Sequence, residues 1–114
     1  MTTLRNSVNL IGHLGNDPEI KTFGENRRMA RFSLATNDYY NDSEGKRVTE
    51  TQWHNVIAWG KMAEIAEKLL NKGNEAAIQG KLVNRSWEDK EGSKHYITEV
   101  VANEIILFGN GNQK

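Results

Sequence analysis

Hydrophobic and polar residues alternate with a period of two along most of the chain, which is typical of strands that bury one face. The segment 48–59 is the clearest case. Its small aliphatic residues, Val56 and Ala58, lie on one side, and its two tryptophans, Trp53 and Trp59, lie on the other. The aliphatic side is the better core face, so the pattern leaves open what the tryptophans contact.

The alternation predicts five main strands and one segment of helical spacing. The predicted strands cover 5–14, 28–38, 48–59, 75–89 and 94–108, with a short extended piece at 19–23. Between the third and fourth strands, apolar residues recur at helical spacing over 61–74, and Gly73 occupies the position of a C-terminal cap. The residues DKEGSK suit the tip of a hairpin between the last two strands.

This order of elements predicts the fold. One short helix between the third and fourth of five strands is the layout of an OB-fold, a small closed β-barrel. We therefore predict an all-β, five-stranded OB-fold barrel in a single domain over residues 1–108, followed by a short disordered tail over 109–114. A generic α+β domain is the alternative, but a barrel better explains the many alternating strands.

The composition argues against catalysis and metal binding. Cysteine is absent, and the three histidines have no metal-ligand spacing, so neutral surface or core histidines are expected. The glycines of GHLGN lack the lysine of a phosphate-binding loop. We predict no catalytic residue, no metal and no cofactor.

Localisation follows from the apolar runs. No secretory signal precedes the first strand, and no run approaches the roughly 18 apolar residues of a membrane span. We therefore expect a cytoplasmic, nucleoid-associated protein with no membrane partner.

The charge balance argues against nucleic-acid binding, whereas the aromatic residues argue for it. Fifteen basic and fifteen acidic residues give a formal net charge of +0, whereas nucleic-acid-binding domains are usually basic. Yet Trp59 is followed by Lys61, Trp87 comes two positions after Arg85, and Tyr40 precedes a basic loop. Filling the core is the alternative role for these rings. Aromatics beside cations on a strand surface suit single-stranded nucleic acid, because bases stack on the rings while the cations follow the phosphates.

Several segments together resemble one family. They are VNLIGHLGNDPEIK, FSLATND, TQWHNVIAWGKMAE, KGNEAAIQGKL and ITEVVANEI, and with preserved spacing they span about residues 7–107. They look like the bacterial single-stranded DNA-binding protein family. The resemblance implies an OB barrel, assembled as a homotetramer, around which single-stranded DNA wraps without sequence preference during replication, recombination and repair.

The resemblance also implies roles for individual residues. The stacking aromatics fall on Tyr40, Trp53, Trp59 and Trp87, and the phosphate-contacting cations fall on Lys21, Lys61, Lys72 and Arg85. Asn55 and Val83 stand where relatives often have arginine, so the groove has lost charge. Arg31 can return some of it, and we add Asn55 and Arg31 to the expected DNA contacts.

The first strand is long and rich in β-formers, so we expect it to be an edge that a second copy can pair with. Val8 and Leu10 of this strand are candidate subunit contacts of a dimer of dimers. The resemblance implies His54 as a further contact, with a satisfied core histidine as the alternative. Many relatives continue into a long linker with an acidic tip. This sequence ends at GNGNQK, as a truncated or a naturally short chain, so recruitment of replication and repair proteins is not predicted.

Two other functions remain. A primosomal OB protein is also short and tailless, but the four aromatics together favour the single-stranded DNA-binding family. A small enzyme or oligosaccharide-binding barrel needs convergent polar groups in a pocket, which the sequence does not indicate.

Overall fold

The computed structural model describes residues 4–25 and 27–108. In this part of the chain the elements are η1 (Leu4–Asn6), β1 (Val8–Leu14), β2 (Glu19–Phe23), β3 (Arg27–Asn41), β4 (Arg47–Trp59), α1 (Lys61–Leu69), β5 (Glu75–Glu88) and β6 (Lys94–Leu107). The expected order of strands and helix is confirmed. The predicted tail over 109–114 lies outside the described residues.

Five of the strands close into a barrel. The hydrogen-bonded order is β1-β5-β6-β4-β3, and β1 returns to β3 through His13↔Ala35 and Leu14↔Leu34. After a turn, β2 continues along the same edge of β3, so the piece expected at 19–23 is a sixth strand that extends the sheet beside the closed ring. The prediction of an OB-fold barrel with one helix before its fourth strand is therefore confirmed.

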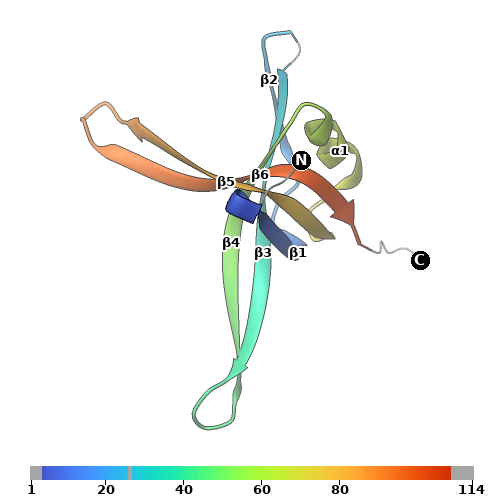
Figure 1. Ribbon diagram of the computed structural model, residues 1–114, viewed down its shortest axis with the longest axis vertical. Helices are drawn as coiled ribbons and strands as arrows, with labels where there is room; N and C mark the ends of the chain where they lie inside the picture. The colour runs from blue at the N-terminus through green and yellow to red at the C-terminus, as the bar shows by residue number, and fades with distance from the viewer. Residues whose placement is uncertain (1–3, 26, 109–114) are drawn as a thin grey trace.

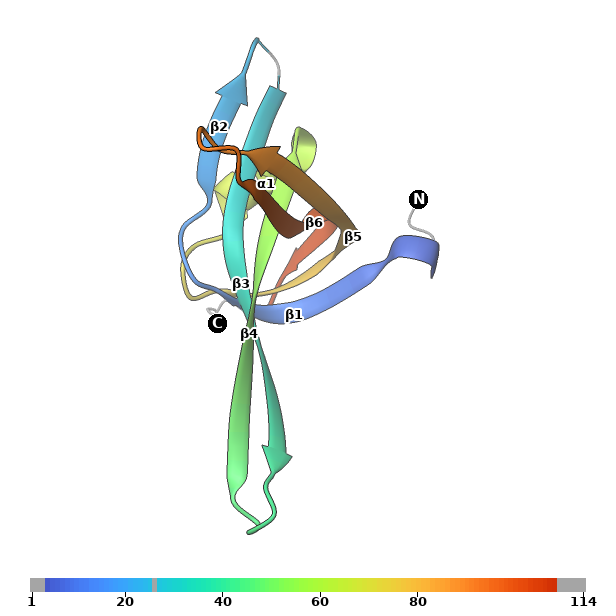
Figure 2. The same ribbon diagram turned by 90° about the vertical axis from the view of Figure 1, so that its left-hand side faces the viewer.

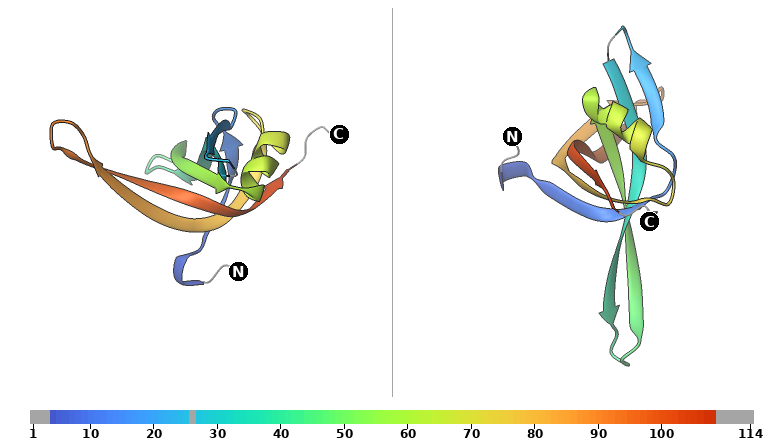
Figure 3. Two further views of the ribbon diagram at one scale, coloured as in Figure 1. Left: turned by 90° about the horizontal axis from the view of Figure 1, so that it is seen from above. Right: turned by 90° about the vertical axis from the view of Figure 1, so that its right-hand side faces the viewer.

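The core comes from alternate residues of the barrel strands. The largest apolar side chains that the strands bury fully are Phe32, Leu34, Ile78 and Val56, and Leu70 after the helix joins them. Helix α1 packs against β3, β4 and β6 and lies at one side of the barrel (Figure 3). It ends at Leu69, earlier than the sequence suggested, and Gly73 instead lies in the following turn with φ 91°.

Close strand crossings explain two glycines. A Cβ on Gly12 would collide with the carbonyl of Ala35, and one on Gly80 with the carbonyl of Val101. Gly12 lies beside the short β1–β3 pairing, and Gly80 lies at a β-bulge between β5 and β6. Both positions must lack a side chain, because only then can the strands approach closely enough for the barrel to close.

Three hairpins project from the barrel in different directions: β2–β3, β3–β4 and β5–β6 (Figure 1). The β3–β4 hairpin is longer than the pattern predicted, because the strands continue to Asn41 and resume at Arg47. Much of the segment expected as a loop is therefore strand. We call the outer part of this hairpin, residues 37–51, the β3–β4 arm; it hangs below the barrel and twists as it leaves it (Figure 2).

Candidate nucleic-acid interface

Strand β4 divides its side chains as its alternation predicted. Val56 and Ala58 are fully buried, whereas Trp53 is 62% exposed and Trp59 is 37% exposed. The tryptophans of β4 therefore lie on the outer face of the barrel. The alternative that they fill the core is excluded in this chain.

A cleft of about 240 Å³ lies beside Trp59 on this outer face; we call it the Trp59 cleft. It is lined by Lys21, Phe23, Met29, Arg31, Ile57, Trp59, Val83, Arg85, Glu99 and Val101. Three predicted DNA contacts, Lys21, Arg31 and Arg85, thus come together around an apolar floor. A flat ring in the cleft would find apolar surface beneath it and cations at the rim.

Phe23 is a member of this cleft that sequence reasoning missed. Its ring centroid lies 5.9 Å from that of Trp59, tilted by 40°, and Arg27 lies over the Trp59 ring at 4.9 Å. Phe23 pairs with Arg27 across the β2–β3 hairpin, which places both on the same sheet face as Met29. The available signal was that Phe23 comes two residues after Lys21 and so shares its strand face, but the register of both with β3 depends on long-range pairing.

Glu99 is a second residue that the sequence did not reveal. Its side chain is 1% exposed, although it lies in the Trp59 cleft. Arg85 donates two hydrogen bonds to its carboxylate, from Nε at 2.7 Å and Nη2 at 2.9 Å, and Arg31 Nη2 lies 3.8 Å away. The hydrogen bonds and charge of Glu99 raise the pKa of Arg85. One buried carboxylate therefore offsets part of the positive charge of two arginines.

Trp87 lies on the β5–β6 hairpin, apart from the Trp59 cleft. Its ring stacks on His95, with centroids 5.4 Å apart and planes 23° apart. His95 Nε2 lies 2.9 Å from Asp89 Oδ2, and Asp89 Oδ1 accepts hydrogen bonds from the backbone N–H groups of Glu91 and Ser93. The hydrogen bond with His95 is the main cause that lowers the pKa of Asp89, and the backbone hydrogen bonds lower it further. The turn thus fixes the histidine against which Trp87 rests.

Trp53 is seated against the turn between β1 and β2. A Cβ on Gly15 would lie 2.5 Å from the far edge of the Trp53 ring and 2.7 Å from Ser33 Oγ. Asn16 holds this region by accepting hydrogen bonds from Ser33 N and Oγ. Asn55 is exposed on the same face of β4, opposite Ser33.

The other predicted DNA contacts lie outside the Trp59 cleft. Lys61 is exposed at the first position of α1. Lys72 is exposed in the turn after α1, and its backbone N–H donates to Asp17 Oδ1 at 2.8 Å, one residue from Asn16. Tyr40 is half exposed, but it lies on the face of β3–β4 opposite to Trp53. It shares that face with His54, whose Nε2 lies 2.9 Å from Thr36 Oγ1.

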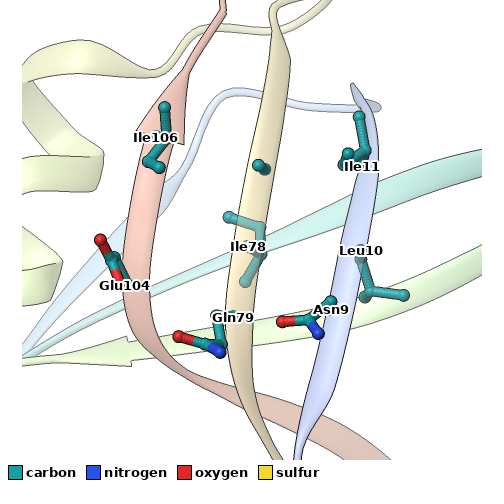
Figure 4. Close-up of a pocket in the computed structure, with 8 residues that line it drawn as sticks. Asn9, Leu10, Ile11, Ile78, Gln79, Glu104 and Ile106 are labelled. Carbon is teal, nitrogen blue, oxygen red and sulfur yellow. The ribbon is translucent and has the colours of Figure 1, made fainter.

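The candidate subunit contacts on β1, Val8 and Leu10, lie on one side of the strand. Both are half-buried and pack against the core, and they stay predicted contacts. The alternate residues Asn9 and Ile11 lie on the outer face with Ile106, around a shallow apolar pocket of about 230 Å³ (Figure 4). Ile11 and Ile106 are both about half exposed. The apolar surface of this strand is therefore offered by Ile11.

Among the described residues, no group of acidic or histidine side chains is placed to hold a metal ion, and no helix has the length and apolar character needed to cross a membrane. The site consists instead of exposed rings and cations on an OB barrel, an arrangement typical of modules that bind single-stranded nucleic acid. Comparison with known proteins agrees. Residues 5–108 match the model of the single-strand binding protein family, and the chain belongs to that family, whose members bind DNA and are not catalysts.

Individual relatives are similar over nearly the whole chain. The single-stranded DNA-binding protein 1 of Chlorobaculum tepidum is 44% identical over 91% of this chain and 65% of its own length. The single-stranded DNA-binding protein of Neisseria meningitidis serogroup A is 38% identical over 95% of this chain and 62% of its own length. The chain thus spans somewhat less than two thirds of these relatives. A solved structure described as the Plasmodium falciparum SSB complex with ssDNA has a TM-score of 0.84 at 29% identity, covering 96% of this chain and 98% of its own.

Proposed function

We propose that this chain binds single-stranded DNA without sequence preference, by stacking bases on Trp53, Trp59 and Trp87. The observation that carries the proposal is the exposure of all three tryptophans on an OB barrel whose core is filled by Phe32 and aliphatic residues. Each stacked base contributes about 1–3 kcal/mol and stacking is indifferent to base identity, because every base has a flat face. The relatives' names and the solved DNA complex support this reading.

Cations complete the binding surface in this proposal. Lys21, Arg31 and Arg85 contact phosphates at the rim of the Trp59 cleft, and Asn55 offers an amide between the two tryptophans of β4. Lys61 and Lys72 contact phosphates beyond the cleft. Tyr40 stays a predicted stacking residue, reached only by DNA that passes round the β3–β4 arm.

The cellular role follows from binding alone. A protein that covers exposed bases protects single strands during replication, recombination and repair, and it needs no catalytic group. We propose that the chain is not an enzyme and acts in the cytoplasm on the nucleoid, in keeping with a family of DNA-binding, non-catalytic proteins.

We propose further that the chain assembles as a homotetramer, a dimer of dimers. One OB domain covers only about 4–16 nucleotides, so several linked domains hold DNA more durably by raising the effective concentration of the next segment. The outer surface around Ile11 and Ile106 supports the proposal, because exposed aliphatic side chains on a sheet favour burial against a second copy. Strand β1 adds an edge, since its short pairing with β3 reaches only His13 and Leu14.

A competition assay tests the proposed activity. The full chain should bind a labelled oligo-dT, and mixed-sequence single strands should compete for it as strongly as unlabelled oligo-dT does. A duplex of the same length should compete far more weakly, because its bases are stacked on one another. Equal competition by the duplex would contradict stacking as the source of affinity.

A further inference from the structure

Two adjacent tyrosines on the β3–β4 arm point to opposite sides. The register of β3 with β4 is unbroken from Met29↔Trp59 to Asn41↔Arg47, and it includes Ala35↔Trp53 and Tyr39↔Thr49. Residues two apart on a strand share a face, and so do residues paired directly across the ladder. Tyr39 therefore lies on the same face as Trp53, and Tyr40 lies on the reverse face.

The two faces of the arm differ in charge. On the reverse face, Asp38 lies directly opposite Glu50, and Tyr40 is the next residue of β3 on that face, two positions along the chain. On the Tyr39 face the neighbouring pairs are neutral: Thr51 donates a hydrogen bond to Asn37 at 2.7 Å, and Thr49 lies opposite Tyr39. Two carboxylates side by side repel a polyanion, so phosphates approach the Tyr39 face more readily than the reverse face.

A cationic side chain also lies over the ring of Tyr39. The guanidinium of Arg47 lies over the Tyr39 ring, 4.3 Å from its centroid, while Tyr39 remains 55% exposed. The cation–π contact orients the ring and leaves its other face free for a base. The same combination occurs where Arg27 lies over Trp59, at the far end of this face.

A concave surface lies beside Tyr39. A cleft of about 190 Å³ at the base of the arm is lined by Ala35, Asn37 and Tyr39 of β3, together with Ile11, Gly12, His13 and Glu75. Glu75 is its one carboxylate, and it pairs with His13 in the β1–β5 ladder. Thr49, opposite Tyr39, is four residues from Trp53 along β4, or about 13 Å at roughly 3.3 Å per residue.

We propose that Tyr39, backed by Arg47, is a further base-stacking site, and that single-stranded DNA leaves Trp53 along the Tyr39 face of the arm. The inference rests on the proposed function and names the path that the DNA follows. It adds a residue that the family resemblance did not supply. The face turns gradually with the twist of the arm, so the bound strand winds with it (Figure 2).

Two substitutions of exposed tyrosines test the proposal. Tyr39→Ala removes the proposed ring, and Tyr96→Ala is the control, because Tyr96 is exposed on β6 and has no place in the proposed DNA surface. Binding of an oligo-dT of about 16 nucleotides, the upper site size of one OB fold, should weaken about 5- to 100-fold for Tyr39→Ala. Tyr96→Ala should bind as the unchanged chain does. Tyr39→Phe keeps the ring and should also retain binding.

Further variants separate this proposal from the proposed function. Trp53→Ala should weaken binding whichever face of the arm is used, and far-UV circular dichroism should report an intact barrel for every variant. If the unchanged chain fails to bind oligo-dT, the proposed function fails. If the chain binds and Trp53→Ala weakens it, but Tyr39→Ala has no effect or no more effect than Tyr96→Ala, the proposed stacking site at Tyr39 is wrong. Arg47→Gln should lower the slope of log affinity against log salt by about 0.7, and an unchanged slope would exclude Arg47 from phosphate contact.

Discussion

Glu99→Gln should make DNA binding tighter and more sensitive to salt. In the Trp59 cleft, the Glu99 carboxylate holds Arg85 by two hydrogen bonds and lies 3.8 Å from Arg31. Glutamine keeps the shape and one acceptor oxygen, but it removes the negative charge that competes with phosphate for the arginines. We therefore expect one more phosphate to be neutralised for each subunit.

The magnitude follows from counterion release. One additional neutralised phosphate steepens the fall of log affinity with log salt by about 0.7, and over the tenfold range from 1 M to 0.1 M salt this is about a fivefold gain in affinity. By the same reasoning, the unchanged chain should show a shallower slope than a strongly basic relative of the family. Its formal net charge is +0, and stacking then carries a large share of the affinity.

Oligo-dT titrations from 0.1 to about 1 M salt measure both quantities. Glu64→Gln is the matched control, because Glu64 is an exposed residue of α1 outside the cleft and its substitution changes the net charge equally. Thermal unfolding checks that the barrel remains stable. Arg85 is half exposed, so water can solvate its guanidinium when the Glu99 carboxylate is lost. We therefore expect a smaller loss of folding free energy than the roughly 3–5 kcal/mol of a broken, fully buried ion pair. Weaker binding by a folded Glu99→Gln, with no steeper slope, would refute the reasoning and make Glu99 a positioning residue for Arg85.

Three further predictions concern the rings and the assembly. Gly15→Ala should displace the Trp53 ring and weaken oligo-dT binding without lowering the melting temperature, and unaltered affinity in the folded variant would contradict the contact. Because the native state lowers the pKa of Asp89, its carboxylate stabilises the hairpin tip above its unfolded pKa of about 3.9, and this stabilisation is lost as pH falls through the lower native value. Trp87 fluorescence should follow that transition, and Asp89→Asn should abolish it; an identical titration in the variant would exclude Asp89. Ile11→Arg should dissociate the proposed tetramer in sedimentation at neutral pH, whereas a monomeric unchanged chain at micromolar concentration would refute the tetramer itself.

The sequence predicted those features that depend on neighbouring residues. Alternation along 48–59 separated Val56 and Ala58 from Trp53 and Trp59, because period two fixes the two sides of any single strand. The change to helical spacing located α1, because this period too depends only on residues close together in the sequence. The fold class followed from the order of these local elements.

Other features depend on pairing between distant segments. Glu99 looks like a solvated charge within the apolar run TEVVANEIIL, and only the neighbouring strands bury it beside Arg85. Phe23 reaches Trp59 only through the register of β2 with β3. The opposite directions of Tyr39 and Tyr40 likewise require the β3–β4 register, which a one-residue slip would reverse.

Tryptophan fluorescence during titration with oligo-dT tests the stacking claim most directly. The chain has three tryptophans, and all three are proposed to stack on bases, so DNA should quench the emission strongly. Trp53→Ala, Trp59→Ala and Trp87→Ala should each reduce both the quenching and the affinity while the barrel stays folded. Tight binding with unquenched emission, or a Trp59→Ala variant that loses DNA only because the barrel unfolds, would contradict the claim that these rings stack on bases.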